Sequence, residues 1–301
     1  LVGIVLSLAV GRYYIPVRDI GKAFLGGEVS DKIAQVLFVV RLPRVLAAVL
    51  IGGAMSLSGA AYQGMFKNPL VSPDILGSSA GAGFGAAVGI LLSFSVAGVK
   101  TSSFVCGILA VSLTWFISQR FGKGSDNLFL LILGGIIVSN LFQSLISLVK
   151  YAADPTDKLP AITFWLMGSL SKATMQDVKI MLVPFAVCTG ILIFCSGQLN
   201  ILALGDEEAK TLGVNTVLLQ GFVIVTATVL TAFSVSFCGM IGWVGLVVPH
   251  LARMMIGPNF KYLIPASALL GSSYLLIMDG FCRSVFAVEI PLGIVTSLAG
   301  L

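Results

Sequence analysis

Uninterrupted apolar runs of about 20 residues recur along the whole chain, and a run of that length, wound as a helix, crosses a bilayer core about 30 Å thick. Of the 301 residues, 57% are hydrophobic and 10% are charged, whereas soluble domains carry about 25% charged residues. The alternating apolar and polar pattern of an outer-membrane barrel is absent from the sequence. The chain is therefore predicted to be an all-α polytopic membrane protein.

About ten membrane-spanning helices can be placed on these runs. The first ends near Val10 and the last begins near Pro291, so both are expected to be truncated in a single transmembrane domain covering residues 1–301. The 242–255 run is short for a span, which indicates a tilted or broken helix. The other runs cover about 44–64, 75–95, 101–119, 127–149, 178–196, 215–236 and 261–279.

Small residues follow a helical repeat in two consecutive runs. In one run the repeat consists of glycine alone, at Gly77, Gly81, Gly85 and Gly89. The preceding run carries a matching series, at Gly52, Ser56, Ala60 and Gly64. Such bare ridges let helix backbones approach closely in lipid. The pattern favours tight helix packing over its alternative, a pore lining.

The sequence carries no convincing catalytic or metal-binding pattern. Residues 77–81 satisfy the Gly-x-Ser-x-Gly pattern of a serine nucleophile, but that serine needs a preceding strand, a histidine and an acid. The only histidine is His250. The five cysteines lack metal-ligand spacing and lie in or beside apolar runs, as small hydrophobic side chains do. We therefore expect no enzyme activity, metal site, cofactor or nucleic-acid partner.

Charged residues beside the spans are the main functional candidates, because burying charge in a membrane is costly. Arg41 and Arg44 are three residues apart, on one face of the predicted start of a helix. Their side chains either reach to the membrane interface or form a docking site for an acidic partner. Asp279 and Arg283 are four residues apart and are expected to neutralise one another.

The longest polar run between two strong spans is GDEEAKTLGV, residues 205–214. Its acidic residues precede its lysine, as they would in the first turn of a short helix whose dipole they stabilise. A solvated loop and a surface helix pressed into another protein are both compatible with this run.

A series of motifs, in this order, resembles the FecCD/BtuC family of membrane permeases. The motifs are RLPR (41–44), AYQGMFKNPLVSPDILG (61–77), LALGDEEAKTLGV (202–214), GWVGLVVPHLAR (242–253) and EIPLGIVTSLAG (289–300). The family comprises permease subunits of type II ATP-binding cassette (ABC) importers for iron–siderophore, haem and cobalamin. The resemblance implies the BtuC-like permease fold of about ten helices, in the cell (inner) membrane.

The resemblance also implies partners and residue roles. A homodimer would enclose one pathway, two cytoplasmic ATPase subunits would energise it, and an extracytoplasmic substrate-binding protein would deliver the substrate. Docking of the binding protein would fall to Arg41, Arg44 and Arg283, and a cytoplasmic gate would include Asn68 and Leu70. The loop that couples to the ATPase would consist of Gly205, Asp206, Glu207, Glu208, Ala209, Lys210, Leu212 and Gly213.

Orientation and substrate are less constrained. The resemblance implies a cytoplasmic N-terminus, whereas the positive-inside rule favours the inverse orientation, unless basic residues outside serve an acidic binding protein.

The chain has no ATP-binding motif, so hydrolysis would reside in the partner subunits. The expected substrate is a metal chelate, with an oxyanion such as molybdate as the alternative. An ion-coupled secondary transporter is less expected, because the spans hold almost no carboxylates.

Overall fold

The computed structural model describes residues 2–11, 13–121, 127–284 and 289–300, and every regular element within these ranges is a helix. This confirms the predicted all-α fold. Six helical segments are long and apolar enough to cross a membrane. They are the continuous segment Asp31–Met65, which ends in α4 (Leu42–Met65), and α6 (Val96–Phe121), α7 (Asn127–Ala152), α9 (Met175–Phe194), α12 (Thr216–Cys238) and α14 (Phe260–Ser284).

Shorter helices complete the bundle. The shorter apolar helices are α5 (Ser78–Leu91) and α13 (Val244–Ile256), and α13 is continuous although it contains Pro249. Eight-residue helices lie at the two ends of the described chain, α1 (Val2–Ala9) and α15 (Leu292–Ala299). The remaining elements are α2 (Val17–Phe24), α3 (Asp31–Ala34), η1 (Gln35–Arg41), η2 (Pro73–Leu76), α8 (Lys158–Leu166), α10 (Ser196–Leu202) and α11 (Asp206–Thr211).

The helix that carries Arg41 and Arg44 begins ten residues earlier than predicted. Residues 31–65 form one continuous helical segment, and Arg41 is the last residue of its π-helical part, η1. The prediction that the two arginines open the helix is therefore wrong. Proline is common in the first turn of a helix because it lacks an N–H group, so Pro43 suggested a helix start. The π-helical turns before it are wider than α-helical turns, and the helix therefore continues through Pro43.

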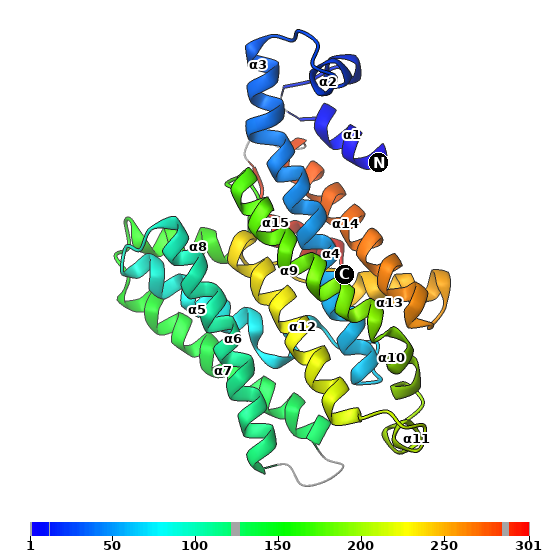
Figure 1. Ribbon diagram of the computed structural model, residues 1–301. Coiled ribbons are helices and arrows are strands. Elements are labelled where there is room, and N and C mark those ends of the chain that lie inside the picture. The colour runs from blue at the N-terminus through cyan, green and yellow to red at the C-terminus, as the bar shows by residue number, and fades with distance from the viewer. Residues whose placement is uncertain (1, 12, 122–126, 285–288, 301) are drawn as a thin grey trace.

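Helices α4 and α12 form the centre of the bundle (Figure 1). More than half of the membrane-spanning window of each is buried, 61% and 67%, against 39% or less for the other four long helices. Hydrogen bonds between side chains join the two helices: Ser58 Oγ is 2.8 Å from Thr231 Oγ1, and Tyr62 Oη is 3.2 Å from Thr228 Oγ1. Polar pairs of this kind fix the register of helices that lipid does not drive together.

Two glycines of the repeat in α5, Gly81 and Gly85, lie against the backbone of α6. A Cβ atom on Gly81 would be 2.5 Å from the carbonyl oxygen of Cys106, and a Cβ on Gly85 would overlap the carbonyl oxygen of Ser102. Gly89 faces the Ser102 side chain in the same way. Gly77 differs, because it precedes α5 in a left-handed conformation (φ 86°) and faces α7. Close contact between α5 and α6 therefore depends on glycine at positions 81 and 85.

The five cysteines are free thiols, and all but Cys106 are buried. The four buried ones belong to the hydrophobic core clusters, as the sequence predicted.

Candidate functional site

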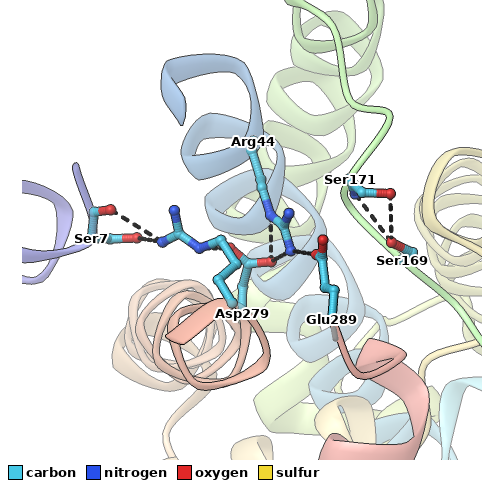
Figure 2. A network of polar contacts seen from close by, with 7 residues as sticks. Ser7, Arg44, Ser169, Ser171, Asp279 and Glu289 are labelled. Carbon is cyan, nitrogen blue, oxygen red and sulfur yellow. Dashed lines mark hydrogen bonds and ion pairs between the residues drawn. The ribbon is translucent and has the colours of Figure 1, made fainter. Parts of the chain in front are cut away.

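At one end of the bundle, the guanidinium group of Arg44 lies between two carboxylates (Figure 2). Its Nε donates to Asp279 Oδ1 at 2.8 Å, and its Nη2 lies 2.7 Å from the same oxygen. Nη2 also donates to Oε1 of Glu289, in the segment just before α15. The side chain of Asp279 is fully buried, whereas that of Glu289 is 32% exposed. Arg44 thus compensates the buried charge of Asp279 on α14 and binds the segment that precedes α15 through Glu289.

The other two arginines of this cluster bind the N-terminal segment. Arg283 Nε lies 3.1 Å from Asp279 Oδ2, which confirms the expected i,i+4 pair, and its Nη2 donates to Ser7 Oγ at 2.6 Å. Arg41 donates to the backbone carbonyls of Leu8 (2.5 Å), Ala9 (3.0 Å) and Tyr13. The cluster therefore ties α1 to η1, which continues into α4, and to α14.

All three arginines are buried, with 5%, 7% and 9% exposure for Arg41, Arg44 and Arg283. The alternative in which Arg41 and Arg44 reach out to the membrane interface is therefore wrong, because their polar ends point to partners within the protein. An acidic docking partner would have to compete with these internal contacts. Sequence reasoning missed Glu289, although two arginines beside a single Asp279 indicate that a further carboxylate is needed to balance the charge.

The predicted coupling loop folds as a short helix at the opposite end of α4 (Figure 1). α11 has its three acidic residues in its first turn and Lys210 in its last turn, as its dipole favours. Glu207, Glu208 and Lys210 are exposed, whereas Ala209 is fully buried in the main core. α4, which is 24 residues and hence about 36 Å long, separates this surface from the arginine cluster.

The predicted gate residues lie in the turn that follows α4. The side-chain oxygen of Asn68 accepts a hydrogen bond from the N–H of Leu70 at 2.9 Å, which closes the turn. The side chain of Leu70 is 76% exposed. Just before it, Lys67 Nζ lies 2.5 Å from Asp206 Oδ1 at the start of α11. The structure thus brings the Asn68–Leu70 turn and α11 together, which spacing in the sequence did not indicate.

An open cavity of about 630 Å³ is lined in part by η2, the element that follows this turn in the sequence. Its polar lining comes from Asp74 in η2, Ser79 in α5, Ser139 and Gln143 in α7, and Ser297 in α15. Ser79 Oγ donates to Asp74 Oδ1, so the serine of the Gly-x-Ser-x-Gly pattern pairs with a carboxylate within the cavity wall. Asp74 was missed by sequence reasoning: it lies within the family motif of residues 61–77, but the roles implied for that motif were confined to Asn68 and Leu70.

A second cavity of about 600 Å³ lies beside the arginine cluster and includes Glu289 in its lining. Ser169 and Ser171, on the segment between α8 and α9, line it from the opposite side (Figure 2). Lys100, also in its lining, forms an ion pair with Asp177 at 2.5 Å. Among the described residues, no group of three or more His, Cys, Asp or Glu side chains is arranged to hold a metal ion.

Comparison with known proteins identifies the family. The sequence pattern of the FecCD transport family matches residues 1–301. This chain belongs to the FecCD family. The match covers both ends of α4, the α11 surface and both cavities, so all the features described above lie within the family's fold.

Relatives of this FecCD permease are named for different substrates. The chain is 42% identical to the molybdate import system permease protein MolB of Haemophilus influenzae, over 98% of this chain and 88% of that protein. It is 37% identical to the hemin transport system permease protein HmuU of Yersinia pestis, over 90% of this chain and 82% of that protein.

A solved structure shares the fold of this FecCD permease. It is described as an inward-facing conformation of a metal-chelate type ABC transporter, and it matches with a TM-score of 0.89 and 39% identity over 99% of this chain and 92% of that chain. The chain is accordingly a multi-pass membrane permease of an ABC importer, and it belongs to a family of transport subunits rather than enzymes.

Proposed function

We propose that this FecCD permease imports a metal chelate of the iron–siderophore, haem or cobalamin type. The observation that carries the proposal is the cavity of about 630 Å³, a volume that suits a multi-atom organic ligand. Asp74 is the one charged side chain in its lining, within the part of the chain that the structure describes. A compact dianion would meet this carboxylate at close range, whereas a larger chelate would fill the cavity and also meet its hydroxyl and amide groups.

Molybdate is the second candidate, because the relative at 42% identity is named for it. Relatives named for haemin and cobalamin are 37% and 35% identical. These values are too close to rank the substrates, so the proposal rests on the size and chemistry of the cavity.

The proposed assembly is a homodimer with two cytoplasmic ATPase subunits and an extracytoplasmic binding protein. Ile294 and Leu298 of α15 are 41% and 67% exposed at the edge of the cavity, and a second copy of the chain would cover them. The exposed acidic residues of α11 form a surface for the ATPase. Arg41, Arg44 and Arg283, at the other end, would exchange their internal contacts for acidic side chains of the binding protein.

Transport would proceed by alternating access. ATP binding would draw the ATPase subunits together, and α11 would pass that motion to helices with two alternative packings. The permease itself would make and break no covalent bond.

Uptake into proteoliposomes tests the proposed substrate class. The permease is reconstituted with its cognate ATPase and binding protein, and ATP-dependent accumulation of radiolabelled ferric siderophore, haem, cobalamin and molybdate is measured in parallel. We expect accumulation of a chelate. Accumulation of molybdate alone would overturn the proposed substrate class while leaving the importer assignment intact.

Capture of the permease by its immobilised binding protein tests the docking role. Arg41→Gln with Arg44→Gln removes both charges without burying new negative charge beside Asp279 and Glu289. We expect weaker capture, while co-purification of the ATPase subunits shows that the permease is still folded. Undiminished capture would contradict docking through these arginines.

A further inference from the structure

Asp206 joins α11 to both central helices of the bundle. Its Oδ1 lies 2.5 Å from Nζ of Lys67, just after α4, and its Oδ2 accepts a hydrogen bond from Gln220 Nε2 of α12 at 3.2 Å. Lys67 has a left-handed backbone conformation (φ 52°), which is uncommon for a residue with a side chain. Lys67 and Asp206 are each one third exposed, so solvent only partly screens their attraction.

α11 is itself firmly attached to the core at one point. Ala209 is fully buried among apolar residues, and its carbonyl oxygen accepts a hydrogen bond from the N–H of Val214 at 2.9 Å. The neighbouring Glu207, Glu208 and Lys210 remain exposed. A displacement of α11 would therefore act on the rest of the protein through Ala209 and through Asp206.

The segment after Lys67 connects this ion pair to the wall of the cavity. Residues 68–72 lead into η2, which contains Asp74 of the cavity lining. η2 is packed tightly against α7 and α13. A Cβ on Gly135 of α7 would overlap the carbonyl oxygen of Ile75, and a Cβ on Gly245 of α13 would overlap Pro73. Packed contacts of this kind shift between discrete arrangements rather than deform gradually.

We propose that the Lys67–Asp206 ion pair is the contact through which α11 controls η2 and the cavity wall. Lys67 and Asp206 are then positioning residues for the coupling of ATP hydrolysis to transport, and this role rests on the proposed ATP-driven import. Glu207 and Glu208 would receive the motion at the surface, and Asp206 would pass it to the segment 67–76. None of these residues contacts the substrate.

The test compares the transport-to-hydrolysis ratio among charge variants. The ratio is the amount of substrate taken up per ATP hydrolysed, measured in the reconstituted complex with whichever substrate the unaltered complex accumulates. We expect Asp206→Asn and Lys67→Met each to lower this ratio by roughly threefold to fivefold, the upper part of the range for a partly exposed ion pair. The double variant K67D/D206K should recover most of the loss, because the reversed pair restores the attraction and the Gln220 amide can present its oxygen instead.

Matched controls separate a coupling role from general charge effects. Lys261→Met removes an exposed lysine at the α11 end, and Asp157→Asn breaks an exposed ion pair with Lys158 (3.6 Å) near α8. Both should keep the ratio of the unaltered complex. The thermal unfolding temperature of each variant in detergent is measured alongside. If the ion pair were purely structural, its loss would lower the unfolding temperature, and charge reversal would not restore the transport-to-hydrolysis ratio.

Three outcomes would overturn the inference. An unchanged ratio in both single variants shows that the ion pair carries no coupling. A double variant no better than the single variants shows that the loss did not come from the lost attraction. If the unaltered complex accumulates no substrate on addition of ATP, both the proposed function and the role of the ion pair are wrong. If its uptake is normal and the variants behave like it, only the role of the ion pair is wrong.

Discussion

Arg44 Nε donates a hydrogen bond to Asp279 Oδ1 at 2.8 Å, although the two residues are 235 positions apart in the sequence. The contact joins α4 to α14, whose backbones also meet closely where Gly52 faces Gly271. A fully buried carboxylate is tolerable only where cations compensate it, and Asp279 has Arg44 and Arg283 for that purpose. The pair therefore determines how this end of the bundle is assembled.

Asp279→Asn should lower the stability of the permease by about 3 kcal/mol, because it leaves two buried arginines short of a carboxylate. The measurement is the unfolding free energy in detergent, followed by circular dichroism. Glu289→Gln is the control: its side chain is 32% exposed, so water can compensate the loss and the cost should be below about 1 kcal/mol. Equal losses in both variants would show that burial of the pair is not what matters.

Gly85→Ala should push α5 away from α6, because the new methyl group would overlap the carbonyl oxygen of Ser102. Overpacking of this kind costs about 1–3 kcal/mol, which should appear as a lower unfolding temperature. Gly190→Ala on α9 is a matched control, since its added Cβ has no heavy atom within 4 Å. A Gly190 variant as unstable as the Gly85 variant would contradict the steric explanation.

The hydrogen bond between Ser58 and Thr231 should contribute modestly to the contact of α4 with α12. A double-mutant cycle with Ser58→Ala and Thr231→Val should give a coupling energy of about 0.6 kcal/mol, the average for such pairs in membrane proteins. The unfolding free energy in mixed micelles is suitable for this measurement. A coupling energy near zero would indicate that Ser58 depends instead on the carbonyl oxygen of Ala227, to which its hydroxyl also donates at 3.0 Å.

Glu207→Gln with Glu208→Gln should lower uptake per ATP hydrolysed, because both exposed carboxylates belong to the proposed ATPase-contacting surface. The reconstituted complex provides the measurement, and co-purification shows whether the ATPase subunits still bind. Normal binding with normal coupling would argue against α11 as the contact surface.

The turn between α7 and α8 should loosen at acid pH. The Thr156 hydroxyl and the N–H groups of Thr156 and Asp157 all donate to Asp154, and these hydrogen bonds lower the pKa of its carboxyl group. The stabilisation is thus fully present above the unfolded-state pKa of about 4 and is lost as the pH falls through the lower folded-state value. Hydrogen exchange at the Thr156 and Asp157 amides, corrected for its intrinsic pH dependence, should accelerate below about pH 4. Asp154→Asn keeps an acceptor oxygen but cannot titrate, so its corrected exchange should not change with pH.

Local sequence rules predicted α11 well and Lys67–Asp206 not at all. The order of acids and lysine in residues 205–214 indicates a short helix, because the helix dipole acts within one turn. Nothing local relates position 67 to position 206, whose side chains meet only after α4 and α10 have packed. Similarly, the repeat Gly81–Gly85–Gly89 indicated a close helix contact, whereas the identity of the partner helix, α6, came from the fold.

The sequence by itself determined that this protein is a bundle of membrane helices of the FecCD family, because hydrophobic length and short motifs are local properties of the chain. Apart from the i,i+4 pair of Asp279 and Arg283, which the spacing predicted, only the tertiary structure decided which charges are compensated. It placed Asp279 and Glu289 beside Arg44, Ser7 beside Arg283, and Asp74 in the wall of a cavity. Electrostatic compensation depends on distance in space and on exclusion of water, and neither is set by separation along the chain.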